Sequence, residues 1–251
     1  MSSARKVCLI TGASRGIGAA VAKLAARRGY DVVVNYSRDV DAAEAVAEAC
    51  AEAGARAEIV KGDMAQAKDV ARLFAEAKRL FGRIDAVVNN AGIAGKASRL
   101  DLASDDTIRA VVDLNVTGAI LAAREAVRAM STLHGGHGGA LVNLSSAAVW
   151  IGSPGEFTWY AASKAAIDTL TLGLAKEVAA EGVRVNAVAP GIIDTEIHAA
   201  SGIADRVARL GPMAPIGRAG TADEVAQAIL YLMSDEAAYV TGTVLKVTGG
   251  R

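Results

Sequence analysis

The chain has 251 residues, a length that suits one domain, and its 27 basic and 27 acidic side chains give a formal net charge of zero. This balance argues against a basic face for nucleic acid and against an acidic tail. Hydrophobic residues make up 52% of the chain but aromatic residues only 4%. The core must therefore consist of alanine, valine, leucine and isoleucine, as in helices packed on a buried parallel sheet.

The expected elements alternate along the whole chain. Strands are predicted at 7–10, 32–35, 57–61, 86–88, 140–144, 183–188 and 243–247, and helices near 17–28, 40–53, 66–81, 104–131, 158–180 and 221–234. Capping-box spacing occurs from Asp63 to Gln66 and from Thr221 to Glu224. The alternation predicts an α/β fold: one Rossmann-like domain over 1–251, with a doubly wound, seven-stranded parallel sheet and three helices on each face.

A glycine-rich turn, TGASRGIG at 11–18, follows the first expected strand. Because Gly12, Gly16 and Gly18 lack a Cβ, the backbone can turn sharply and its amides can approach a pyrophosphate at the start of the next helix. A tight turn without a ligand is the alternative. The place between the first strand and the first helix is where dinucleotides bind in such folds, so we expect a dinucleotide site.

The end of the second expected strand bears on which dinucleotide binds. An NAD site usually has an acidic residue about 20 residues after the glycines, but here that place holds Asn35, followed by Tyr36, Ser37 and Arg38. The guanidiniums of Arg38 and Arg15 can pair with a 2′-phosphate. We therefore predict NADP(H) over NAD(H), with solvated arginines and an NAD(H)-preferring alcohol or sugar dehydrogenase as the alternative.

Polar residues suited to catalysis gather at later strand ends. NNAG at 89–92 ends the fourth expected strand, and LSS at 144–146 ends the fifth. Asn115 lies inside a predicted helix, where its side chain competes with the backbone. Tyr160 and Lys164 are four residues apart on one helix and so project from one face.

The chain resembles the short-chain dehydrogenase/reductase family in its motifs and in their order. These motifs are TGASRGIG, NNAG, the helical Asn115, a serine before YAASK, PGIIDT at 190–195 and the final VTGG. The resemblance runs from residue 7 to residue 250. The variant with NYSR, WYAASKAAIDTL and NAVAPGIIDTEI is similar to bacterial members labelled glucose 1-dehydrogenase-like or 3-oxoacyl-carrier-protein reductase-like.

The resemblance implies a catalytic role for four residues. Tyr160 would be the general acid/base, with a pKa that we expect the Lys164 ammonium to lower. Ser146 would hold the substrate oxygen, with Ser145 as the alternative or helper. Asn115 would position a water that links Lys164 to solvent.

The resemblance also implies a cofactor site. Asp63 would accept a hydrogen bond from the adenine amino group, cap a helix, or do both. The backbone at Ile193 would bind the nicotinamide carboxamide, and Thr195 would bind the carboxamide or the pyrophosphate. The full set is Gly12, Ser14, Arg15, Gly16, Ile17, Gly18, Asn35, Tyr36, Ser37, Arg38, Asp63, Met64, Asn89, Ala91, Gly92, Tyr160, Lys164, Pro190, Gly191, Ile193 and Thr195.

The sequence says less about which residues bind the substrate. Trp150 and Glu156 are candidates for the pocket wall, whereas Trp159 is expected to pack elsewhere. His198 opens an expected lid at about 194–212. His134 and His137 lie among glycines without further ligands, so we expect a loop and no metal site.

The remaining expectations concern partners and compartment. The helix at 158–180 is rich in small residues, and the resemblance implies a homotetramer assembled through it, with a buried helix of a monomer as the alternative. Cys8 and Cys50 form no CxxC motif and are expected to be buried, inert thiols, which fits a reducing compartment. No apolar run is long enough for a signal peptide or a membrane span, so we expect a cytoplasmic protein.

The leading hypothesis is thus an NADP(H)-dependent carbonyl reductase or alcohol dehydrogenase with a small-molecule substrate. Function depends on the site and not on the fold. A catalytically silent dinucleotide-binding interaction protein, or a nucleotide or methyl-donor binder on a similar fold, remains the alternative. The Tyr160–Lys164 pair discriminates, since such proteins do not need it.

Overall fold

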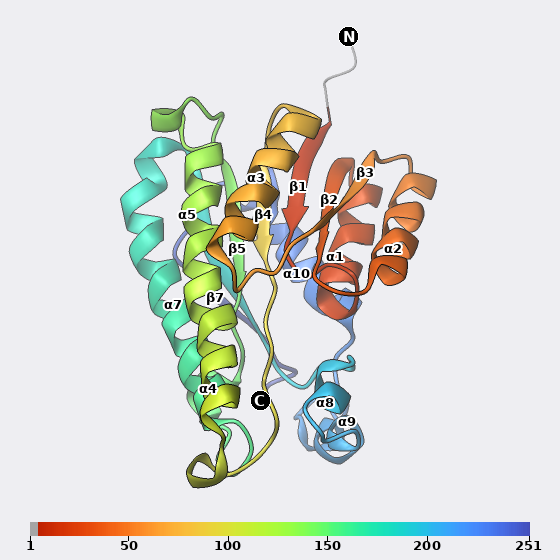
Figure 1. The fold of residues 1–251 in the computed structure, drawn as a ribbon, viewed down its shortest axis with the longest axis vertical. Helices are drawn as coiled ribbons and strands as arrows, with labels where there is room; N and C mark the ends of the chain where they lie inside the picture. Colours follow the sequence, from red (N-terminus) through yellow and green to blue (C-terminus); the bar gives the residue numbers. More distant parts are fainter. Residues whose placement is uncertain (1–4) are drawn as a thin grey trace.

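Seven parallel strands in the order β3-β2-β1-β4-β5-β6-β7 form the centre of the computed structural model, which describes residues 5–251 (Figure 1). The strands are β1 (Lys6–Ile10), β2 (Tyr30–Tyr36), β3 (Ala57–Lys61), β4 (Ala86–Asn89), β5 (Gly139–Leu144), β6 (Val183–Pro190) and β7 (Val244–Val247). Their valine-rich runs suit strands that are covered on both faces. The predicted fold class is confirmed.

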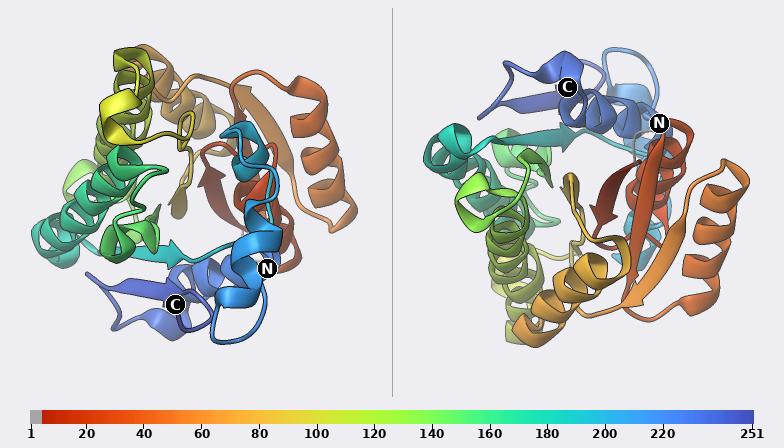
Figure 2. Two further views of the ribbon diagram at one scale, coloured as in Figure 1. Left: turned by 90° about the horizontal axis from the view of Figure 1, so that it is seen from below. Right: turned by 90° about the horizontal axis from the view of Figure 1, so that it is seen from above.

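Helices cover both faces of the sheet (Figure 2). The helices are α1 (Gly16–Arg27), α2 (Val40–Glu52), α3 (Ala67–Phe81), α4 (Asp105–Val112), α5 (Ala119–Met130), α6 (Ala148–Ile151), α7 (Thr158–Val178), α8 (Ile197–Ala200), α9 (Arg206–Leu210) and α10 (Ala222–Met233). One core layer unites α1, α2 and α10, and the other unites α3, α5 and α7. Both layers are built largely from alanine, valine and leucine, as the composition predicted.

Two local predictions needed correction and one was confirmed. The expected helix at 104–131 is interrupted by a π-helical turn, Asp113–Gly118, between α4 and α5. The capping box from Asp63 was wrong, because α3 begins at Ala67 and the Asp63 carboxylate accepts instead from the backbone N–H of Ala65. The box at Thr221 is present, with reciprocal bonds to Glu224 at the start of α10.

In Figure 1 the strands run downwards, and α8 and α9 lie below their carboxyl ends. The connection from β1 leads to β2 on one side, whereas β4 lies on the other side of β1. This reversal of strand order is the place where α/β sheets bind ligands. Among residues 5–251, no helix combines the length and the apolar character needed to cross a membrane.

Candidate active site

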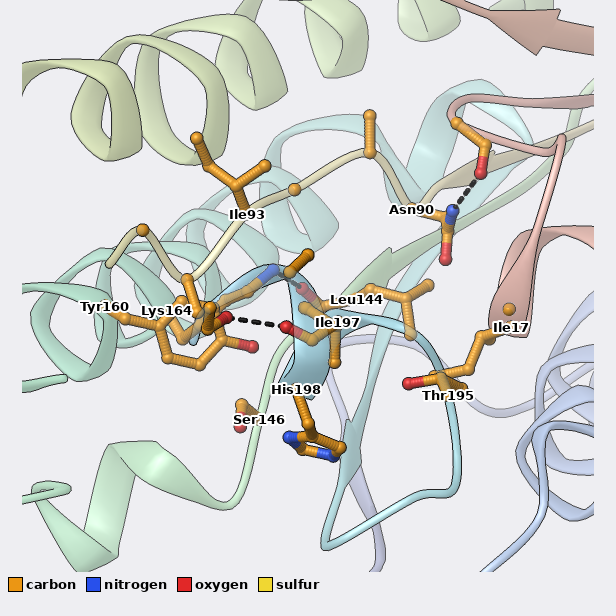
Figure 3. A pocket seen from close by; sticks show the side chains of 18 of the residues that line it. Ile17, Asn90, Ile93, Leu144, Ser146, Tyr160, Lys164, Thr195, Ile197 and His198 are labelled. Atoms are coloured by element: carbon orange, nitrogen blue, oxygen red, sulfur yellow. Dashed lines mark hydrogen bonds between the residues drawn. The ribbon is translucent and has the colours of Figure 1, made fainter. Parts of the chain in front are cut away.

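A cavity of about 1270 Å³ lies at this carboxyl edge. Its wall begins at the glycine-rich turn after β1, passes the ends of β2, β4 and β5, and reaches α7 and the 194–212 segment. Figure 3 shows the central part, where Tyr160, Lys164, Ser146 and His198 surround one space. The turn and the Tyr–Lys pair, which lie 150 residues apart in sequence, therefore share a single cavity.

The geometry of the glycine-rich turn fits a dinucleotide pyrophosphate. Gly12 and Gly16 have φ values of +62° and +55°, which side chains with a Cβ rarely adopt. At Gly18 a Cβ would lie 2.5 Å from the carbonyl oxygen of Gly12, so only glycine allows this close approach. The Asn90 amide donates to the carbonyls of Thr11 and Gly12 at 2.8 and 2.9 Å. The turn is thus held open to the cavity at the start of α1.

Asn35 supports this turn from the second strand. Its Oδ1 accepts from the Gly12 N–H at 3.0 Å, and its Nδ2 donates to the carbonyls of Val60 and Gly62. The Asn35 side chain is therefore engaged within the protein. Ser37 and Arg38, by contrast, are exposed and line the cavity.

Tyr160 and Lys164 lie one turn apart on α7, with the Lys164 Nζ 5.7 Å from the centre of the tyrosine ring. The ammonium donates to the Leu144 carbonyl at 2.7 Å, as Figure 3 shows. Burial lowers the pKa of Lys164 to about 8, against the effect of the Asp168 carboxylate. The lysine is thus a buried cation anchored to the end of β5.

The pKa of Tyr160 differs from the expectation. Burial raises it above its usual range, against hydrogen bonding from Ser146 and the positive charge of Arg206. The lowering that we expected from Lys164 is not found, and its ammonium donates to the Leu144 carbonyl. In this state the phenol is protonated at neutral pH.

The consecutive serines after β5 have different surroundings. Ser146 Oγ accepts from the backbone N–H of Ala148 at 3.1 Å, which leaves its proton free to point towards Tyr160. The Ser145 side chain is buried, and its hydroxyl faces Asp168 on α7. The geometry therefore favours Ser146, as aligned from the sequence, as the partner of the phenol.

Asn115 lies in the π-helical turn and is 1% exposed. Its side chain accepts from the Ile93 N–H at 2.9 Å and donates to the Ile93 carbonyl at 2.8 Å and to Ser163 Oγ at 3.1 Å. The side chain thus ties the loop after β4 to α7. These bonds occupy both N–H groups of the Asn115 side chain within the protein, so its role in positioning a water stays a prediction.

The 194–212 segment lines one end of the cavity. Glu156 accepts from Arg206 and Arg209 of α9, each at 2.9 Å, and the Arg206 guanidinium lies 5.2 Å from the centre of the Phe157 ring. Burial alone would raise the pKa of Glu156, but the hydrogen bonds from these two arginines hold it below its usual range. This ion-pair cluster joins α9 to the loop that precedes α7.

His198 adds a neutral polar group to the same end. Its Nε2 donates to the Ile193 carbonyl at 3.0 Å, since a carbonyl oxygen can only accept. Burial lowers the pKa of His198, so the ring is neutral at pH 7 and Nδ1 carries a free lone pair. His198 lines the same cavity as Ser146 (Figure 3).

The comparisons with known proteins agree with this geometry. The family model described as Enoyl-(Acyl carrier protein) reductase matches residues 12–251. The uncharacterized oxidoreductase YgfF of Escherichia coli is 46% identical over 245 residues, which cover 98% of this chain and 99% of that protein. A crystal structure of a short chain dehydrogenase from Burkholderia cenocepacia in complex with NADP has a TM-score of 0.89 at 36% identity, with 98% and 97% of the chains covered. The chain belongs to the short-chain dehydrogenase/reductase family.

Members of this family bind a nicotinamide dinucleotide, but the relatives do not settle which one. The 3-ketoacyl-(acyl-carrier-protein) reductase of Brucella melitensis was crystallised with NADH, and it too has a TM-score of 0.89, at 33% identity with 98% of each chain covered. This protein is therefore an oxidoreductase of the short-chain dehydrogenase/reductase family, and its choice of dinucleotide has to be argued from its own residues.

Most residues that the sequence assigned to the family's site line the cavity. Those that do are Gly12, Ser14, Arg15, Gly16, Ile17, Asn35, Ser37, Arg38, Asp63, Met64, Ala91, Gly92, Ser146, Tyr160, Lys164, Pro190, Gly191, Ile193 and Thr195. Gly18, Tyr36, Asn89 and Asn115 lie behind the wall. Asn89, for example, donates to the Ala119 carbonyl and to Asn143 in the interior.

The outcome for the other candidates is mixed. Glu156 and His198 line the cavity, but Trp150 does not, and its ring packs 4.3 Å from the Lys246 ammonium. Trp159 packs as expected and donates to the Ala94 carbonyl. Sequence reasoning missed Asn90 and Arg206. For Asn90 the signal was its place beside Asn89 at a strand end, whereas nothing local marks Arg206. Residues 5–251 hold no cluster of potential metal ligands.

Proposed function

We propose that this protein is an NADP(H)-dependent oxidoreductase that transfers a hydride between nicotinamide and a carbonyl or secondary alcohol substrate. The observation that carries the proposal is the shared cavity, in which Tyr160, Lys164 and Ser146 meet at one end of a wall that starts at the glycine-rich turn. When bound, the nicotinamide would supply or accept the hydride. Every other task falls to side chains and backbone groups of this chain.

Tyr160 is the proton donor and acceptor of the proposed reaction. Burial keeps its phenol protonated, which prepares it to donate to a carbonyl oxygen. The free proton of Ser146 points to the same place, where it stabilises the charge that builds on that oxygen. Lys164 has donors beyond the one that binds Leu144, and these suit the ribose hydroxyls of the dinucleotide.

The preference for NADP(H) is supported by the charges around the adenosine end. Arg15 and Arg38 both line the cavity and are exposed, and neither forms an ion pair within residues 5–251. The neighbouring carboxylate of Asp39 accepts from the Ala42 N–H as the cap of α2. Two arginines are thus available for a 2′-phosphate.

The substrate lid and the assembly are further parts of the proposal. The 194–212 segment acts as the lid, since α8 and α9 supply the wall opposite Tyr160. Apolar side chains at Val112, Ile120 and Leu172 are exposed on α4, α5 and α7, which supports a homotetramer that buries these helices. Light scattering on the purified protein measures the assembly directly.

The decisive experiment combines coenzyme oxidation with one conservative variant. Purified protein is given NADPH or NADH with a panel of small ketones, keto steroids, 3-oxoacyl thioesters and sugars, and the loss of reduced coenzyme is followed. For a substrate that reacts, we expect Tyr160→Phe to lower kcat at least about 100-fold while NADPH still binds. Tyr231→Phe, an exposed tyrosine on α10, is the matched control.

A Tyr160→Phe variant with near wild-type turnover would overturn the acid/base assignment. If NADPH binds but no panel member reacts, the silent dinucleotide-binding alternative gains and the proposed activity is rejected for these substrate classes. A stronger response to NADH than to NADPH would overturn the coenzyme preference alone.

A further inference from the structure

A carboxylate lies on the same helix as the proposed proton-transfer residues. Asp168 is one helical turn beyond Lys164 on α7 and is partly buried. The roles proposed above for Tyr160, Lys164 and Ser146 leave it unused. A partly buried carboxylate one helical turn from a buried cation needs a physical reason, because burial of either charge alone is costly.

The contacts of Asp168 point to Ser145. Among the side chains that the structure describes, four buried polar atoms lack a hydrogen-bond partner, and two of them are Ser145 Oγ and Asp168 Oδ1. They are complementary, since a hydroxyl donates and a carboxylate accepts. Burial raises the pKa of Asp168, and the Ser145 hydroxyl acts against that rise by favouring the ionised form. Each atom is thus a suitable partner for the other.

The surroundings of Lys164 leave Asp168 as the group that supports its charge. From β5 the lysine meets the neutral Leu144 carbonyl, and from the loop after β4 it meets the backbone of Gly92, where a Cβ would lie 3.4 Å from Nζ. On α7 its titratable neighbours are Tyr160 and Asp168. The Arg206 guanidinium acts on Tyr160 from α9 and would repel a second cation. Within residues 5–251, Asp168 is thus the acidic group that favours the ammonium.

We propose that Asp168, aligned by the Ser145 hydroxyl, is a positioning residue that keeps Lys164 in its ammonium form at the end of β5 during turnover. Ser145 and Ser146 then divide two tasks, because one serves the lysine and the other serves the substrate oxygen. The value of this role for catalysis rests on the proposed function, but the effect on Lys164 does not.

The direct test is the titration of Lys164 by NMR in protein labelled with 13Cε-lysine, measured without coenzyme or substrate. Lys164→Met identifies the signal. We expect a midpoint of about 8 in the wild type. In Asp168→Asn the midpoint should fall by about one pH unit, because the charge that favours the ammonium is gone. Thr169→Ala, an exposed neighbour on the same helix, should leave it unchanged.

Two more variants separate the alignment of Asp168 by Ser145 from a general effect of substitution on folding. Ser145→Ala keeps the carboxylate and should shift the midpoint in the same direction by less. Asp168→Glu keeps the charge and should restore part of the lost shift. An unchanged midpoint in both Asp168→Asn and Ser145→Ala overturns the proposal, whatever the enzyme's activity.

If a substrate is found, the pH profile gives a second measurement. Turnover that needs the ammonium fails at high pH, so the alkaline limb of kcat/KM should move to lower pH in Asp168→Asn. A loss of kcat that is equal at every pH would show a merely structural role and overturn the proposal. Because the NMR titration needs no substrate, its outcome stays separate from the fate of the oxidoreductase assignment.

Discussion

The Oδ1 atom of Asn35 accepts a hydrogen bond from the backbone N–H of Gly12 at 3.0 Å, so a side chain of β2 holds the turn that follows β1. The Nδ2 atom of the same side chain donates to the carbonyls of Val60 and Gly62. An amide can accept on one side and donate on the other, which a carboxylate cannot. The neutral residue at this position is therefore required by the local structure.

Asn35→Asp should destabilise the protein. The new carboxylate would face two carbonyl oxygens without a proton to donate, at a position that is 1% exposed. We expect a loss of about 3 kcal/mol in the free energy of unfolding at pH 7, measured by urea denaturation. Ser37→Ala, at an exposed residue just after the same strand, is the control. Equal stability of Asn35→Asp and wild type would contradict the role of these bonds.

Arg38→Ala should weaken NADPH binding selectively. A charge-assisted bond to a 2′-phosphate contributes more than a bond to a hydroxyl, so we expect about a 10- to 100-fold rise in the Kd for NADPH. The Kd for NADH should stay close to that of the wild type. Titration of coenzyme fluorescence measures both constants.

Arg27→Ala on α1 is the matched control for Arg38, because Arg27 is exposed and lies outside the cavity wall. If Arg38→Ala raises both Kd values equally, the arginine contributes only a general positive charge. The preference for NADP(H) would then lose its main support.

The fold was predictable from local patterns because short apolar runs alternate with longer helical patterns along the whole chain. Valine-rich runs such as 32–34 favour strands covered on both faces, and the turn at 11–18 needs glycine at positive φ. The positions of Tyr160 and Lys164 on one face of α7 also follow from spacing alone.

Other features depend on contacts that no local pattern encodes. The π-helical turn at Asn115 arises where the side chain reaches across to Ile93, 22 residues earlier. The inward orientation of Asn35 is set by Gly12, and the pairing of Glu156 with Arg206 spans 50 residues. The pKa of Tyr160 went against expectation because burial, a property of the whole fold, outweighed the hydrogen bond from Ser146 and the charge of Arg206.

Glu156→Gln should loosen the 194–212 segment. The carboxylate binds both Arg206 and Arg209, and these arginines are themselves trypsin sites. Without the two ion pairs α9 should open more often, so trypsin should cleave after both residues several-fold faster, as measured by mass spectrometry of timed digests. The KM of any substrate should rise with it.

Glu177→Gln removes an exposed carboxylate on α7 and serves as the control for Glu156. Its digestion should match that of the wild type. A Glu156→Gln protein that resists trypsin as well as the wild type would mean that apolar packing, and not this ion-pair cluster, holds α9 in place.

Lys164 should make stability depend on pH in the alkaline range. Its pKa is about 8 in the folded protein against 10.5 for an exposed lysine. The cost of burying the ammonium is therefore present in full below pH 8 and is relieved as pH rises towards 10.5, since the unfolded chain then binds more protons than the folded one. Relative to Lys164→Met, which lacks the titrating group, the wild type should gain about 2 kcal/mol between pH 7 and pH 9.5. Urea denaturation at the two pH values measures this gain, with Lys176→Met, an exposed lysine of α7, as the control. A stability difference that stays flat with pH would mean that water reaches the ammonium and that Lys164 is not the buried cation on which the proposed proton chemistry depends.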